Sequence, residues 1–328
     1  MGRLRRASAV VGFMLILAGC VEYRHPKGPD VIEPALVGEH WRAADGALFP
    51  LRSWLPSTPP KAVVLALHGM NDYSHAFDAP GKALAAKGIA TYAYDQRGFG
   101  NGPHPGFWSN ASTMASDLNA AARLLHDRHP DVPLYVLGES MGGAVAIVAA
   151  QAPSPAISGV ILSAPAVWGR TSMSWFQHGA LWLAQKVAPG WTLTGRGLGI
   201  QASDNIEMLR ALSRDPLVIK ATRVDAIHGL VDLMDEAQTA IAALHLPVLV
   251  LYGERDQVIP SPPTWAAIRH LPELGKTQRV ALYADGWHML LRDLQAQVVM
   301  DDIAAWIVAP ARPLPSGADL RAEPALAQ

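Results

Sequence analysis

The chain has one cysteine, Cys20, among its 328 residues. An intramolecular disulfide needs two cysteines, so a disulfide framework is excluded whatever the redox compartment. The chain also lacks an excess of either charge, because 27 Lys and Arg stand against 28 Asp and Glu. Nucleic-acid binding depends on clustered cations that displace counterions from phosphates. We therefore expect no nucleic-acid partner.

A long apolar run is missing as well. The apolar stretch at 7–19 is too short to cross a bilayer comfortably, since a spanning helix needs about 20 residues. It follows Arg3, Arg5 and Arg6, and this order of charges and apolar residues is that of a secretory signal. Residues 17–20, LAGC, resemble the lipobox of bacterial lipoproteins, in which cleavage leaves an acylated N-terminal cysteine.

The lipobox resemblance predicts a signal peptide at 1–19 and membrane attachment through acylated Cys20. Val21 follows the cysteine, in place of the aspartate associated with inner-membrane retention in some bacteria. This favours the outer membrane, with the protein facing the periplasm. The alternative is a cytosolic protein with an apolar N-terminus and a chance cysteine.

Short apolar runs dominate the middle of the chain, which is 50% hydrophobic and 17% charged and can bury one large core. Nearly unbroken hydrophobicity over strand length is typical of strands buried on both faces of a parallel sheet. An Asp-Gly pair at 45–46 also predicts a hairpin between 39–43 and 48–55. We predict a doubly wound, mostly parallel, eight-stranded sheet, with its parallel strands at 62–69, 89–95, 133–138, 159–165, 247–253 and 279–284.

Outside this pattern lie three other segments. The stretch 20–37 is polar and rich in proline, which predicts a tether, and the tail 309–328 has the same character and is expected to be disordered. The core then comprises 38–166 and 245–308. Between them, 167–244 has no strand pattern and is predicted to form a helical cap.

A possible helix within this insertion has both a start and a stop signal. Asp204 is the expected N-cap, with Glu207 three residues on. Asp215-Pro216 is the expected stop.

The run GESMGG (138–143) interrupts an apolar stretch where a strand is expected to give way to a helix. Gly138 and Gly142 permit a sharp turn without Cβ clashes, which leaves the hydroxyl of Ser140 projecting above the sheet. This is the context of a nucleophile elbow. We predict that Ser140 is a catalytic nucleophile, the alternative being a serine that only caps a helix.

A serine nucleophile needs a base and an orienting acid, here expected in the chain order Ser, acid, His. Asp256 follows the strand 247–253, and His288 follows the strand 279–284. The carboxyl ends of parallel strands meet at one edge of a sheet, so both are expected near Ser140. Glu254 and Asp285 remain rivals for the role of the acid.

Two backbone N–H groups are expected to stabilise the oxyanion. One belongs to Met141, directly after the nucleophile, and the second to the loop after the first parallel strand, HGMN (68–71). We assign the second donor to Met70. His68 precedes it and is expected to be a structural hydrogen-bonding residue.

These motifs, together with DQRGFG (95–100), GERD (253–256) and GWHML (286–290), resemble an α/β-hydrolase of the monoacylglycerol lipase group, also called the lysophospholipase or serine aminopeptidase S33-like group. The resemblance implies a triad of Ser140, Asp256 and His288, a helical cap over an acyl pocket, and no metal or cofactor. Asp256 fits the group's GxxD spacing.

Tryptophans gather in the insertion, where Trp175 and Trp182 are seven residues apart and so share a helix face. With Trp168 they are candidates for the wall of an apolar substrate pocket. The alternatives are that they pack the cap onto the body or contact a membrane surface.

We expect a serine hydrolase that cleaves esters of apolar acyl groups, of the monoacylglycerol or lysophospholipid type. Two alternatives stay open. One is a peptidase or amidase, because the same catalytic groups cleave amides. The other is a catalytically silent envelope lipoprotein that uses the fold for binding.

Overall fold

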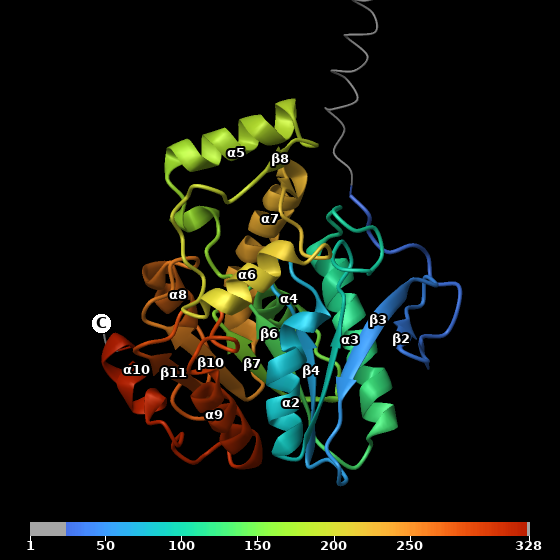
Figure 1. Cartoon of the computed structure of the whole chain (residues 1–328), viewed down its shortest axis with the longest axis vertical. Helices are drawn as coiled ribbons and strands as arrows, with labels where there is room; N and C mark the ends of the chain where they lie inside the picture. Colours follow the sequence, from blue (N-terminus) through green and yellow to red (C-terminus); the bar gives the residue numbers. More distant parts are fainter. Residues whose placement is uncertain (1–23, 327–328) are drawn as a thin grey trace, which may run out of the picture.

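The computed structural model describes residues 24–326. A nine-stranded sheet forms its centre, in the order β1-β2-β3-β5-β4-β6-β7-β10-β11 (Figure 1). The six strands β5, β4, β6, β7, β10 and β11 pair in parallel, and β1, β2 and β3 add antiparallel pairs at one edge. The predicted doubly wound, mostly parallel sheet is therefore confirmed. Its strands are β1 (Ala35–Val37), β2 (His40–Arg42), β3 (Leu48–Trp54), β4 (Ala62–Leu67), β5 (Ile89–Tyr94), β6 (Leu134–Glu139), β7 (Ile157–Ser163), β10 (Val248–Gly253) and β11 (Gln278–Tyr283).

The ninth strand corrects the predicted count of eight. β1 lies inside the segment 20–37 that was predicted to be a tether, and it pairs with β2 so that Leu36 stands opposite Trp41. Gly38, with φ of 58°, makes the tight turn between the two strands. Three residues are too few to show an alternating pattern, which is why the sequence did not reveal this strand.

Helices cover both faces because alternate residues of each buried strand point to opposite sides. In β4, Val63, Leu65 and Leu67 face one core cluster, whereas Ala62, Val64 and Ala66 face the other. The first cluster lies under α3 (Ala111–Arg128), α4 (Met141–Ala149), α7 (Val224–Ala240) and α8 (Ser261–Ile268). The second lies under η1 (Ser74–Phe77), α2 (Asp78–Ala86) and α9 (Ala296–Val308).

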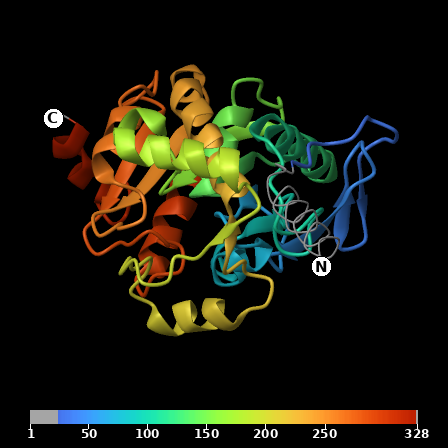
Figure 2. The ribbon, with the colours of Figure 1, turned by 90° about the horizontal axis from the view of Figure 1, so that it is seen from above.

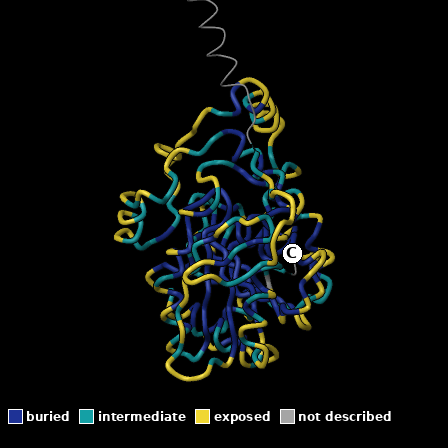
Figure 3. Tube along the Cα trace, turned by 90° about the vertical axis from the view of Figure 1, so that its right-hand side faces the viewer, coloured by how far each residue is buried: buried dark blue, intermediate teal, exposed yellow. Residues whose placement is uncertain are grey.

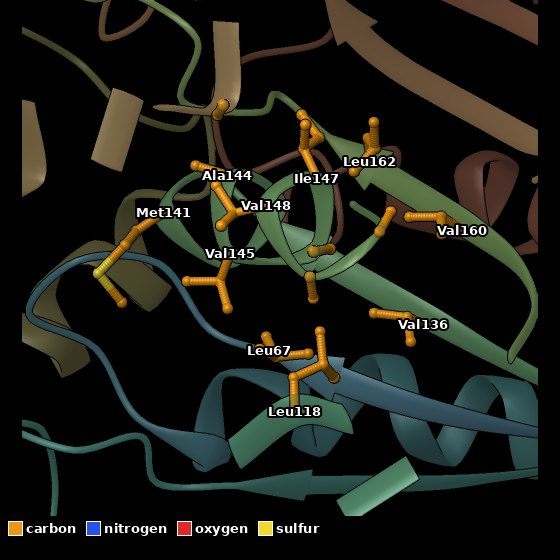
Figure 4. Close-up of a cluster of buried hydrophobic side chains, with 14 of the residues drawn as sticks. Leu67, Leu118, Val136, Met141, Ala144, Val145, Ile147, Val148, Val160 and Leu162 are labelled. Atoms are coloured by element: carbon orange, nitrogen blue, oxygen red, sulfur yellow. The ribbon is translucent and has the colours of Figure 1, made fainter. Parts of the chain in front are cut away.

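The helix after the predicted elbow is buried along its whole length. Val145 and Val148 of α4 lie over the sheet among Leu67, Val136 and Val160 (Figure 4). Burial of one such side chain contributes about 1.5–3 kcal/mol. The start of α4, which the catalytic chemistry would use, is therefore anchored to the centre of the sheet.

The tail forms a helix within its described part, 309–326, in contrast to the prediction of disorder for 309–328. α10 (Ala318–Leu326) packs along the edge strand β11, with Ala318 and Ala322 buried. Arg279 of β11 pairs with Asp319 at 2.9 Å. The helix covers an edge strand that would otherwise be open to another chain. The prolines and the glycine of the tail are typical of irregular structure, so this short helix was not predicted from the sequence.

Between β7 and β10 the chain forms a cap of η2 (Arg170–Ser172), α5 (Trp175–Val187), α6 (Ile206–Arg214), α7 and η3 (Ile241–Ala243). It also contains one short antiparallel pair, β8 (Thr192–Leu193) with β9 (Thr222–Arg223), so the expectation of no strand here is wrong. Figures 1 and 2 show that α7 contacts the body, and that α5 lies on the side of α7 that faces away from the body.

The helix expected after Asp204 is α6, but its N-cap is Asn205, whose side chain accepts a hydrogen bond from the N–H of Met208 at 3.1 Å. Asp204 instead accepts from the N–H of Leu294 in the body. The helix ends at Arg214, directly before Asp215-Pro216, as predicted.

Exposure differs sharply along the chain (Figure 3). The central strands are buried, and the exposed residues concentrate in the loops and in α5. Within residues 24–326, no helix combines the length and apolar character needed to cross a membrane.

Candidate active site

Ser140 sits in a strained turn between β6 and α4. Its φ of 53° and ψ of −114° lie in a region that L-residues rarely adopt. A Cβ on Gly138 would overlap the backbone of Gly142, and one on Gly142 would overlap the carbonyl oxygen of Leu67. The glycines two before and two after the serine are therefore required by close backbone contact.

The loop after β4 packs directly onto this turn. A Cβ at Gly69 would lie 3.4 Å from the Cβ of Ser140 and 4.0 Å from its Oγ. The next residue, Met70, thus has its backbone beside the serine. Met141 is the first residue of α4, and the first N–H groups of a helix have no intrahelical acceptor. Both predicted oxyanion donors belong to segments that adjoin Ser140.

His68 is fully buried and holds this loop in place. The N–H of Gln96 donates to Nε2 of His68 at 3.0 Å, so Nε2 is unprotonated and Nδ1 carries the proton. Nδ1 lies 2.8 Å from the carbonyl oxygen of Gly69, to which it donates. Burial lowers the pKa of His68, which keeps the ring neutral. This bond fixes the peptide plane that contains the N–H of Met70.

Asp256 and His288 form the second half of the site. Nδ1 of His288 lies 2.9 Å from Oδ2 of Asp256, and both side chains are almost completely buried. The other oxygen of Asp256 accepts the N–H groups of Val258 and Ile259 at 2.7 and 3.0 Å. The carboxylate therefore has a fixed orientation, and the ring atom Nε2 of His288 is left for a proton.

The two rival acids lie elsewhere. Asp285 forms an ion pair with Arg255 at the surface, and Glu254 is exposed. The ends of β10 and β11 approach so closely that a Cβ on Gly253 would overlap the carbonyl of Gly286. Of the three carboxylates weighed from the sequence, it is Asp256 that hydrogen-bonds to His288.

Arg292 connects the loop of His288 with the loops of Ser140 and Met70, and it was not predicted from the sequence. Its guanidinium is buried and donates to Asp72 at 2.8 Å and to Glu139 at 3.1 Å. Glu139 precedes Ser140, Asp72 belongs to the loop of Met70, and Arg292 lies four residues after His288. The nucleophile, oxyanion and base loops therefore share one edge of the sheet. In the sequence, LLRDL gives no sign of a buried arginine.

The predicted pocket tryptophans do not form an enclosed wall. Trp175 and Trp182 are 86% and 58% exposed, and Trp168 is partly buried against the main core. The inward face of α5 is carried by Leu181 and Gln185, one turn apart, which leaves the tryptophans on other faces. The predicted lipidation site, Cys20, lies outside the described residues.

These groups suit acyl transfer. A hydroxyl on a strained turn, a histidine oriented by a buried carboxylate, and backbone N–H groups in the segments that adjoin the hydroxyl are the parts that such chemistry uses. Among residues 24–326, no group of three or more His, Cys, Asp or Glu is arranged to hold a metal ion.

Comparison with known proteins identifies the family of the chain. The family model Hydrolase_4, described as serine aminopeptidase, S33, matches residues 58–295. The chain is 28% identical over 269 residues to the monoacylglycerol lipase of Mycolicibacterium smegmatis, covering 78% of this chain and 91% of that protein. It is 29% identical over 287 residues to the monoglyceride lipase of Rattus norvegicus, covering 84% and 93%.

Solved structures agree on the fold. The monoacylglycerol lipase of Paleococcus ferrophilus superposes with a TM-score of 0.67 at 20% identity, covering 80% of this chain and 98% of that one. A soluble variant of the monoglyceride lipase of Saccharomyces cerevisiae, in complex with a substrate analogue, gives 0.69 at 21% identity and covers 87% and 98%. The fold is that of the α/β-hydrolases.

Proposed function

Because this chain, a carboxylic ester hydrolase, belongs to the serine aminopeptidase S33 family, we propose that it cleaves monoacylglycerol-type or lysophospholipid-type esters through an acyl-enzyme on Ser140. The observation that carries the proposal is the strained turn at Ser140, on the same sheet edge as the hydrogen-bonded pair of His288 and Asp256. The names of the relatives support the substrate class.

In the first half of the reaction, Oγ of Ser140 attacks the ester carbonyl carbon while Nε2 of His288 takes its proton. The buried carboxylate of Asp256 stabilises the imidazolium and keeps Nδ1 protonated. The N–H groups of Met70 and Met141 donate to the oxyanion. His288 then returns the proton to the leaving alkoxide, and a water molecule releases the acyl group by the same steps in reverse order.

The test is a substrate panel on the purified protein: monoacylglycerols, lysophospholipids, p-nitrophenyl esters and aminoacyl p-nitroanilides. We expect ester turnover to fall at least about 10³-fold in Ser140→Ala, with folding intact by circular dichroism. Ser112→Ala is the matched control, because Ser112 is exposed on α3. Ester turnover that survives in Ser140→Ala would refute the mechanism, and a preference for the anilides would assign a peptidase instead.

We also propose that acylated Cys20 holds the protein on a membrane, at the periplasmic face of an outer membrane. The placement of Arg24 supports a fixed orientation there. Arg24 pairs with Asp232 of α7 at 3.2 Å, and the same carboxylate pairs with Arg170, just before α5. Four extended residues span at most about 14 Å, so the anchor would stay near the cap.

The exposed apolar residues of α5 would then face the lipid. They include Trp175, Phe176, Trp182 and Leu183. Mass spectrometry of the mature N-terminus tests the anchor directly, because acylation must add the mass of the acyl chains to a chain that begins at Cys20. An intact Met1 would refute it.

A further inference from the structure

One stretch of the cap, residues 201–205, is hydrogen-bonded to the loops of both His288 and Asp256. The carbonyl of Ala202 accepts from the N–H of Met289 at 2.9 Å. On the other side, the N–H of Gln201 donates to the side chain of Gln257 at 3.0 Å. The residues immediately after the base and the acid are thus both bonded to the cap. We call residues 201–205 the strap.

At the centre of the strap, Ser203 is bonded to a buried carboxylate that two donors share. Asp293 accepts from the hydroxyl of Ser203 at 2.5 Å with one oxygen, and from the N–H of Trp287 at 2.7 Å with the other. Ser203 is fully buried and Asp293 is 6% exposed. Trp287 is the residue directly before His288, so this carboxylate connects the cap to the backbone that carries the base.

Two more hydrogen bonds connect the strap to the C-terminal end of the loop that carries His288. Asn205 donates through Nδ2 to the carbonyl of Arg292 at 3.0 Å, and the N–H of Leu294 donates to Asp204 at 2.9 Å. The loop 287–294 is therefore bonded directly to the cap only after the histidine, and Asp293 passes the connection back to Trp287 before it. Asp256 bonds the imidazole directly, and the strap bonds the loop that carries it.

We propose that Ser203 and Asp293 are positioning residues for His288, through which the cap controls the base. Catalytic rates depend steeply on such placement, since an error of about 1 Å can cost 10²-fold. Movement of the cap at α6, which follows the strap directly, would displace the base as well as open the site. The proposal rests on the proposed function, because it assumes that His288 is the base.

Charge and burial strengthen the two hydrogen bonds that the carboxylate of Asp293 accepts. Burial raises the pKa of Asp293 to about 6, so near neutral pH it is ionised and accepts both bonds. Hydrogen bonds to an ionised acceptor are stronger than neutral ones. Loss of one donor leaves a charged oxygen buried without a partner, which favours local rearrangement of the loop.

The test compares Ser203→Ala with Ser213→Ala, in which an exposed hydroxyl on α6 is removed. We expect Ser203→Ala to lower kcat on a soluble p-nitrophenyl ester about tenfold, with KM within twofold. Labelling of Ser140 by a fluorophosphonate should slow by a similar factor, because it needs the same base. Ser213→Ala should change none of these.

Asp293→Asn should cost at least as much as Ser203→Ala, and the double variant should match Asp293→Asn alone, because both residues act through one contact. Amide exchange in 286–294 should accelerate in Ser203→Ala, a readout that needs no activity. Wild-type kcat, labelling and exchange in Ser203→Ala would overturn the proposal. An unreactive wild-type Ser140 would instead overturn the proposed function, while the exchange measurement still tests the strap.

Discussion

The catalytic edge of the body and the outer helix of the cap are built in opposite ways. In the body, each loop of the site is held by buried contacts: His68 to Gly69, Asp256 to His288, and Arg292 to Glu139. In the cap, α5 contacts mainly α7 and leaves its largest side chains in solvent. Rigid loops suit chemistry, which needs fixed geometry, whereas an exposed apolar helix suits contact with an apolar partner.

The largest contrast is expected for two arginine substitutions. Arg292→Met would leave Asp72 and Glu139 buried without their shared cation, which we expect to cost about 3–5 kcal/mol of unfolding free energy. Arg255→Met breaks a pair whose side chains are 53% and 48% exposed, and it should cost less than about 1 kcal/mol. Urea unfolding measures both. Equal costs would mean that the buried cluster does not hold the site together.

A smaller contrast is expected for two helix glycines changed to alanine. Gly142→Ala places a methyl group into the carbonyl of Leu67, so the elbow must move, and we expect ester turnover to fall about 10²-fold. Gly179→Ala in α5 meets no atom within 4 Å and should stabilise the protein by about 0.5–1 kcal/mol. Turnover and thermal unfolding of both variants check this. An active Gly142→Ala enzyme would contradict the geometry of the elbow.

The same division explains what the sequence could predict. Ser140, Asp256 and His288 each follow a strand whose apolar run is unmistakable, and the order of parallel strands brings their ends to one edge. Short runs of consecutive residues were enough to predict the strands and the motifs that follow them. The general rules for parallel sheets then predicted that the candidate triad meets at one edge.

Contacts between distant segments were not predictable in this way. Arg292 stands 153 residues from Glu139, and Ser203 stands 90 from Asp293, so no local pattern links either pair. For α5, the spacing of Trp175 and Trp182 indicated a shared face, but not whether that face turns inward. Packing of α5 on α7 decides that, and it buries Gln185 and part of Leu181 instead.

The smallest effect on catalysis is expected where the apolar surface is largest. Trp175→Ser with Trp182→Ser removes two exposed rings, so kcat on a soluble p-nitrophenyl ester should stay within twofold. In a protein that starts at residue 21, binding to phosphatidylglycerol vesicles should weaken at least about tenfold, since buried tryptophan contributes much of such affinity. The matched control is Trp265→Ser, because the ring of Trp265 packs against Tyr252 in the body. This substitution should lower stability but should not weaken the binding of the folded protein to vesicles. If the two cap rings instead proved necessary for turnover of the soluble ester, α5 would belong to the catalytic half of the molecule, and the contrast between a rigid site and a partner-facing cap would be lost.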